Sequence, residues 1–154
     1  MGNMFYGMKG MRSEKPEVIE LLKVLTELAK TCREPLSAQN VGNMFYGMQS
    51  MSSDEPEVIE LLKVLTKLAL TCREDLLPKH VAMMFLGLKS MSSDKPEVIE
   101  LLKVLTKLAL TCREDLDAQA VGNIFYGLKG MSSDKPEMIE LLKVLTKLRI
   151  VGSD

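Results

Sequence analysis

A forty-residue period constrains the fold of this 154-residue chain more strongly than any other feature of its sequence. One phenylalanine, one proline and, in the first three copies, one cysteine recur at this spacing: Phe5, Phe45, Phe85 and Phe125; Pro16, Pro56, Pro96 and Pro136; Cys32, Cys72 and Cys112. Self-similarity at such a period is typical of solenoids, in which each unit packs on its neighbours. We therefore predict a single repeat domain of four units, residues 1–35, 36–75, 76–115 and 116–154.

Each unit has the apolar spacing of two helices, which we name helix A and helix B. In the second unit, helix A is predicted from the N-cap Ser37 to about Met51. One apolar stripe follows the helical spacing: Val41, Met44, Phe45 and Met48. Helix B begins around Pro56 and has a wide leucine-rich stripe opposite its charged residues. The prediction is an all-α solenoid of eight helices, whose first helix is short because the chain enters it at Gly2.

A glycine recurs in the middle of helix A, where it costs on the order of 1 kcal/mol relative to alanine. The four positions are Gly7, Gly47, Gly87 and Gly127. They lie on the flank of the apolar stripe, so we interpret them as places where the next helix A approaches closely. Replacing them with alanine is therefore expected to weaken the stacking of the units.

The two ends of the array differ from its middle. Lys30 replaces the leucine of Leu70 and Leu110, and Arg149 replaces an alanine of the inner units. Terminal repeats need polar outer faces, so we interpret both residues as caps. The abrupt start at Gly2 is predicted to leave apolar residues of the first helix A partly uncovered, which favours self-association through the N-terminal end. Those residues are Met4, Phe5 and Met8.

Composition and spacing exclude several classes of function. The 20 basic and 21 acidic residues leave a net charge of -1, which creates no overall field that gathers nucleic acid or an anionic membrane. Neither a signal peptide nor an apolar run of about 20 residues is present in the sequence. Cysteines spaced one per unit are too far apart for disulfides, which predicts reduced thiols in the cytoplasm or another reducing compartment. A single histidine and no nucleophile–base pair predict a protein without enzyme activity, metal or cofactor.

Helix A is the candidate binding face, because the differences between units gather there. Helix B is identical over residues 56–76 and 96–116, whereas the polar side of helix A varies. Stacking would align two ladders of side chains on that side: Tyr6, Tyr46, Leu86 and Tyr126, beside Asn3, Asn43, Met83 and Asn123. Lysines make the face mildly basic: Lys9, Lys79, Lys89 and Lys129. A tyrosine stripe of this kind has two interpretations, recognition of a partner or packing between crowded helices.

The third unit interrupts both ladders, because Met83 replaces asparagine and Leu86 replaces tyrosine. Methionine adapts to partners of varied shape, so the pair is consistent with a protein contact. The other explanation of the two substitutions is neutral sequence variation at a partly covered position. We interpret the lone His80 as a surface residue, because no second histidine or carboxylate pair accompanies it.

The segment AQNVGNMFYGMQSM, with partial echoes in the other units, resembles the first helix of octotricopeptide-type and heptatricopeptide-type repeats. The resemblance implies a right-handed superhelix with helix A on its concave side and binding of organellar RNA through residues near the start of helix A. Transferred by position, these residues are Asn40 and Asn43, His80 and Met83, and Ala120 and Asn123. This chain departs from the pattern in its acidic overall charge and its four units. Likeness to other tandem helical repeats of about forty residues implies the fold alone.

Three hypotheses of function follow. The first is a non-enzymatic solenoid that binds or scaffolds a macromolecular partner, a protein in the first place, through the helix A face. The second is binding of single-stranded RNA by the same face, since tyrosine and lysine can stack bases and contact phosphates. The third is an idealised or purely structural repeat without a natural ligand, which the 21-residue identity of helix B favours.

Overall fold

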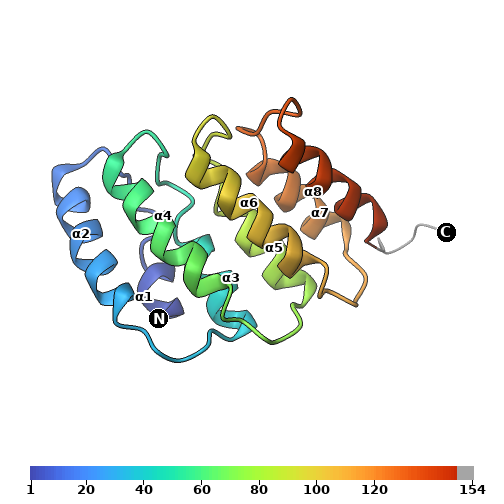
Figure 1. The fold of residues 1–154 in the computed structure, drawn as a ribbon, viewed down its shortest axis with the longest axis horizontal. Helices are drawn as coiled ribbons and strands as arrows, with labels where there is room; N and C mark the ends of the chain where they lie inside the picture. The colour runs from blue at the N-terminus through green and yellow to red at the C-terminus, as the bar shows by residue number, and fades with distance from the viewer. Residues whose placement is uncertain (149–154) are drawn as a thin grey trace.

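The computed structural model describes residues 1–148, which form eight α-helices in two layers (Figure 1). The A helices make up one layer: α1 (Gly2–Tyr6), α3 (Ala38–Tyr46), α5 (Pro78–Leu86) and α7 (Ala118–Gly127). The B helices make up the other: α2 (Pro16–Lys30), α4 (Pro56–Ala69), α6 (Pro96–Ala109) and α8 (Pro136–Lys147). Each helix contacts the helix of the same kind in the adjacent unit. The predicted all-α solenoid with a short first helix is confirmed.

The predicted helix starts are confirmed, whereas helix A is shorter than expected. Ser37 Oγ accepts a hydrogen bond from the Asn40 amide at 3.0 Å, and Asp117 caps α7 in the same way. Helix α3 ends at Tyr46, five residues before the predicted end at Met51. From Gly47 the chain continues in tight turns, because successive amides bond three residues back instead of four.

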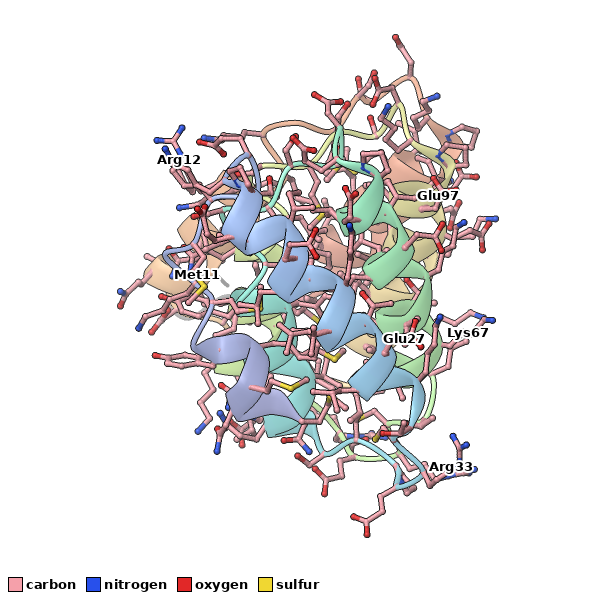
Figure 2. The ribbon with its side chains drawn as sticks, turned by 90° about the vertical axis from the view of Figure 1, so that its left-hand side faces the viewer. Met11, Arg12, Glu27, Arg33, Lys67 and Glu97 are labelled. Atoms are coloured by element: carbon pink, nitrogen blue, oxygen red, sulfur yellow. The ribbon has the colours of Figure 1, made fainter. Side chains whose placement is uncertain are left out.

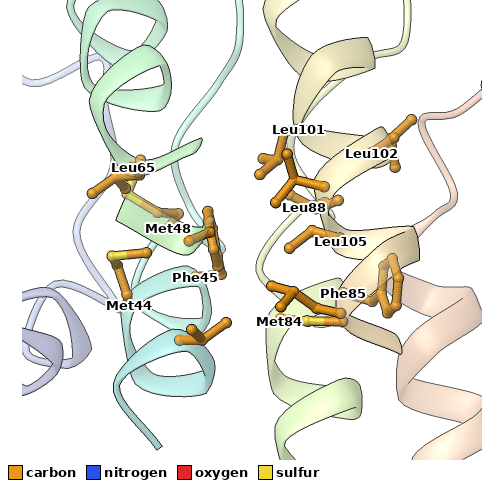
Figure 3. Close-up of a cluster of buried hydrophobic side chains, with 14 of the residues drawn as sticks. Met44, Phe45, Met48, Leu65, Met84, Phe85, Leu88, Leu101, Leu102 and Leu105 are labelled. Carbon is orange, nitrogen blue, oxygen red and sulfur yellow. The ribbon is translucent and has the colours of Figure 1, made fainter. Parts of the chain in front are cut away.

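The core lies between the two layers, where the apolar stripes of the A and B helices meet (Figure 3). Its largest side chains come from the repeated phenylalanine and from the leucines of helix B. The residues labelled in Figure 3 are Met44, Phe45, Met48, Leu65, Met84, Phe85, Leu88, Leu101, Leu102 and Leu105, and all are buried. Burial of these stripes, not intrinsic helix preference, stabilises helices as short as nine residues.

The repeated glycine lies at the C-terminal end of each A helix, not in its middle as predicted, and it allows the backbones of adjacent A helices to touch. A Cβ atom at these positions would lie 1.7 to 1.9 Å from a carbonyl oxygen of the preceding helix A. The pairs are Gly47 with Phe5, Gly87 with Phe45, and Gly127 with Phe85. The predicted close approach is therefore confirmed for three glycines, but it is made to the preceding unit, not to the next. Gly7 has no such neighbour, since the nearest atom to its Cβ position is 3.7 Å away in its own helix.

Buried serines link the turns of successive units. Ser13 Oγ accepts a hydrogen bond from the Ser52 amide at 2.8 Å, and Ser53 Oγ accepts one from Ser92 at 3.0 Å. Ser93 repeats this contact with the Ser132 amide at 2.8 Å. Each bond satisfies a turn amide and fixes the register of one unit on the next.

The predicted cap at Lys30 is not supported by the burial of its equivalents. Leu70 and Leu110 are 59% and 58% exposed, so their positions face solvent and the lysine at Lys30 covers no stacking surface. Arg149 lies outside the described residues. At the N-terminal end, Phe5 and Met8 are buried against the second unit, whereas Met4 is partly exposed. The prediction of uncovered apolar residues was therefore wrong for Phe5 and Met8.

Cys32, Cys72 and Cys112 are free thiols, and each donates a hydrogen bond to a backbone carbonyl two residues further along the chain. Among residues 1–148, no helix combines the length and the apolar character needed to span a membrane.

Candidate functional site

The structure aligns the first two tyrosines of the predicted ladder, Tyr6 and Tyr46, whose rings stack. The rings of Tyr6 and Tyr46 lie 5.4 Å apart at an angle of 20°. Leu86 occupies the third rung, so Tyr126 stands apart from the stacked pair. An offset pair of this kind is favourable by about 0.5–1.5 kcal/mol beyond burial alone. Packing between units is therefore enough to explain why Tyr6 and Tyr46 are aligned.

The lysines of this face are held against the tyrosines. Lys9 Nζ lies 4.4 Å from the centre of the Tyr6 ring and 3.2 Å from its hydroxyl oxygen. Lys129 repeats this arrangement on Tyr126, at 4.5 Å and 3.4 Å. Lys89 adds a longer contact with Tyr126, at 5.8 Å. These cation–π contacts occupy the ring faces that a stacked ligand would need.

A groove of about 770 Å³ opens in the helix A layer, at the interruption of the ladders. Its walls combine aromatic rings of the first two units, apolar side chains and one lysine of the third, acidic groups of the loop before α7, and amide side chains of α7 itself. The lining residues are Tyr6, Tyr46, Leu77, Pro78, Lys79, Ala82, Met83, Leu86, Glu114, Asp115, Asp117, Gln119, Ala120 and Asn123. A tyrosine at position 86 would project into this space, so the substitution to leucine helps to open it.

The acidic wall results from a second departure from the repeat. In the second unit, Glu74 is anchored because its carboxylate accepts a hydrogen bond from the Ala38 amide at 2.8 Å. The equivalent of Ala38 in the third unit is Pro78, which has no N–H to donate. Among the described residues, the exposed carboxylate of Glu114 therefore has neither this anchor nor another hydrogen bond or ion pair, and it faces the groove beside Asp117.

His80 and Asn43 are not part of the open face, which corrects two of the predicted binding residues. His80 is only 5% exposed, and its Nδ1 accepts a hydrogen bond from the Leu77 amide at 3.0 Å. Its Nε2 therefore carries the proton and lies 3.2 Å from Gln39 Oε1. Burial, followed by the charge of Lys79, lowers the pKa of His80 below its usual value. Asn43 is also buried, and its side-chain oxygen accepts a hydrogen bond from Gln39.

His80 is thus a structural link between α3 and α5, not the surface residue that the sequence predicted. The imidazole accepts from the backbone N–H of Leu77, the residue before α5, whereas Ser37 and Asp117 each accept from the amide three residues further along the chain. Leucine at position 77 has no side-chain acceptor, and the His80 amide instead bonds to the Leu77 carbonyl oxygen at 2.9 Å.

The remaining predicted residues are divided between the groove and its surroundings. Six of them line it: Tyr6, Tyr46, Lys79, Met83, Leu86 and Asn123. Five others are not among its lining residues: Asn3, Asn40, Lys89, Tyr126 and Lys129. Sequence reasoning missed Glu114 and Asp115 at the rim. The signal was available, since in a two-helix hairpin the end of helix B returns to the start of helix A.

Comparisons with protein-family models, with curated proteins and with solved structures found no significant match. Within residues 1–148, no group of three or more His, Cys, Asp or Glu side chains is arranged to hold a metal ion. The groove combines an apolar floor, an aromatic side and an acidic wall.

Proposed function

We propose that the protein is a non-enzymatic α-solenoid that binds a segment of another protein through the groove at its third unit. The observation that supports this proposal is the coincidence of two departures from the repeat at one place: leucine instead of tyrosine at Leu86, and proline instead of an N–H donor at Pro78. One opens the space, and the other leaves the carboxylate of Glu114 without its usual anchor. The best ligand is a peptide with an apolar side chain next to lysine or arginine.

The chemistry of the lining selects for such a peptide. Met83 and Leu86 are half-buried, so an apolar side chain placed against them removes further apolar surface from water. The flexible Met83 can adjust to side chains of different shape. A cationic group beside that side chain would meet the carboxylates of Glu114 and Asp117, whose opposite charge favours it.

The same contacts make RNA the weaker alternative. Tyr6 and Tyr46 already cover one another, and Lys9 lies over the first ring, so a base must displace these contacts before it can stack. The acidic wall at Glu114 also repels phosphate. RNA binding remains the runner-up, because Lys89 and Lys129 gather near Tyr126 outside the groove.

A random peptide library displayed on phage tests the proposal, with a variant of the same protein as the control. The double variant Met83→Asn with Leu86→Tyr restores the residues of the second unit and fills the groove. Peptides selected on the wild-type protein should contain an apolar residue beside a basic one, and they should lose most of their affinity for the double variant. Equal binding to both proteins would exclude the groove as the binding site.

The acidic wall is tested with the same peptides and the variant Glu114→Gln. Exposed ion pairs contribute about 0.2–1 kcal/mol, so the dissociation constant should rise about 1.5- to 5-fold at low salt and change less at high salt. Titration of labelled single-stranded RNA at two salt concentrations provides the comparison with the alternative. RNA affinity that falls steeply with salt and survives in the double variant would favour the alternative.

A further inference from the structure

The outer face of the first unit presents apolar residues whose equivalents are buried in later units. Val24, Leu28 and Met11 are 57%, 48% and 39% exposed. Their equivalents Val104, Leu68 and Met51 are 7%, 8% and 0% exposed, and Val64 is half-buried, because a preceding unit covers them. Figure 2 looks onto this face, formed by α1 and α2, with Met11 labelled at its side. The face is therefore one half of the interface that stacks the units.

The outer face of the fourth unit presents the other half. Phe125 is 47% exposed, whereas the equivalent phenylalanines of the first three units are fully buried by the unit that follows them. Ile139 on α8 is 40% exposed, and Leu142 is half-buried where Leu102 is fully buried. Terminal repeats usually carry polar caps, but these described side chains are apolar.

Two contacts that join adjacent units inside the chain have no partner within the chain at the outer faces: the glycine–carbonyl contact and the Lys–Asp ion pair. At Gly47, Gly87 and Gly127, a carbonyl group of the preceding unit packs against the glycine. The same space beside Gly7 is open. In the fourth unit, the carbonyl group in this position is that of Phe125, and it lies on the opposite outer face. At the rim, Lys95 Nζ lies 3.9 Å from Asp54 of the preceding unit, and the corresponding pair across the two outer faces is Lys15 with Asp134.

We propose that copies of this chain associate head to tail, with α1 and α2 of one copy stacked on α7 and α8 of the next. The occupant of each face is a second copy, because the interface between adjacent units would continue with the same residue types: Gly7 against the Phe125 carbonyl group, and Lys15 beside Asp134. The contact is heterologous, since the two faces differ. It therefore does not close at two chains, and the expected product is an open series of dimers, trimers and longer assemblies.

The test uses two variants that block opposite faces. Gly7→Ala adds a methyl group that has space within its own chain, where the nearest atom is 3.7 Å away, but that would meet the Phe125 carbonyl group of a second copy. Phe125→Glu places a charge on the half-exposed face of the fourth unit, and Ile139→Lys serves if circular dichroism shows that Phe125→Glu does not fold. Gly10→Ser is the contrasting variant on the same face, because the equivalent Ser50 and Ser90 hydroxyls donate to backbone carbonyl groups of the preceding unit, so this change should preserve or strengthen association.

Light scattering and sedimentation velocity across a concentration series should show a mass that rises beyond a dimer for the wild-type chain and for Gly10→Ser. Each blocking variant alone should be monomeric, with a dissociation constant raised about tenfold or more. A mixture of the two blocking variants in equal amounts should form one dimer that grows no further, since both of its outer faces are blocked. A monomeric wild-type chain, a mass that stops at two chains, or Gly7→Ala that associates like the wild type would overturn the proposal.

Discussion

Replacement of Gly87 by alanine tests whether backbone contact between A helices sets the stability of the stack. Gly87 has φ of -59° and ψ of -19°, values that any L-residue adopts without strain, so the effect of the new methyl group is steric. Its Cβ atom would lie 1.8 Å from the Phe45 carbonyl oxygen, whereas Cβ atoms almost never approach other atoms within 3.0 Å. Helices α3 and α5 must therefore separate by about 1.2 Å, the difference of these distances.

The size of the effect follows from the side chains packed along this contact. A gap of 0.5–1 Å already removes about a quarter to a half of the dispersion energy across an interface. Overpacking in cores costs about 1–3 kcal/mol and sometimes more, and here the obstacle is backbone, which cannot rotate away. Gly87 follows the last residue of α5, so the helix preference of alanine offsets less than the roughly 1 kcal/mol of a position inside a helix. We expect a net loss of about 2 kcal/mol in the free energy of unfolding, and a melting temperature about 4–8 °C lower.

Gly7→Ala is the control, because it makes the same chemical change at an equivalent position without a carbonyl group nearby. Both variants should be unfolded with urea and followed by circular dichroism at low protein concentration, where copies do not associate. Gly7→Ala should match or slightly exceed the stability of the wild type. If Gly87→Ala lies within about 0.5 kcal/mol of Gly7→Ala, the contact between backbones is not what fixes the spacing of the units.

Two further substitutions test the polar links between units. Ser53→Ala removes the acceptor of the Ser92 amide and should cost about 1–2 kcal/mol in urea unfolding, whereas Ser133→Ala, which removes an exposed hydroxyl, should cost less than 0.5 kcal/mol. His80→Asn should change how stability depends on pH. Because the folded protein lowers the pKa of His80, the unfolded chain takes up the proton first as pH falls, and stability is lost below about 6.5, the pKa of an unperturbed histidine. The stability advantage of the wild type over His80→Asn, measured by urea unfolding, should therefore shrink between pH 8 and pH 5. An advantage independent of pH would show that the buried imidazole makes no pH-linked contribution.

The sequence predicted those parts of the fold that repeat. Eight helices, two per unit, and the role of glycine at Gly47 follow from the period and from the apolar spacing, because each unit faces the same physical environment. The predicted cap at Lys30 failed for a geometric reason. Sequence alone does not say which side of helix B faces a neighbouring unit, so Leu70 was assigned to a contact although it is 59% exposed.

The groove was less predictable than the fold, because it depends on what the substitutions do to neighbours that are distant in sequence. The interruption at Met83 and Leu86 was visible, and both residues line the groove. The acidic wall was not visible in the sequence. Pro78 affects Glu114 by failing to donate a hydrogen bond to it, and the two residues are 36 positions apart. The burial of His80 escaped notice for a similar reason, because its partner Gln39 belongs to the preceding unit.

Peptide binding and head-to-tail association should be separable, because the groove and the stacking faces share Tyr6 but otherwise use different residues. Stacked copies would place Tyr126 beside Tyr6 of the next copy and so continue the ladder that Tyr6 and Tyr46 begin, while Leu86 would still interrupt it once per chain.

The groove is lined within one chain, so the monomeric Gly7→Ala variant should bind a selected peptide with the dissociation constant of the wild type. Fluorescence anisotropy of the labelled peptide measures this directly. If Gly7→Ala remains monomeric and loses the peptide, the binding site spans two copies and the single-chain groove is not sufficient. If peptide affinity is unchanged while assembly disappears, the groove acts independently of the stack, and assembly serves to present several grooves in a row, which raises the affinity for ligands that carry the motif more than once.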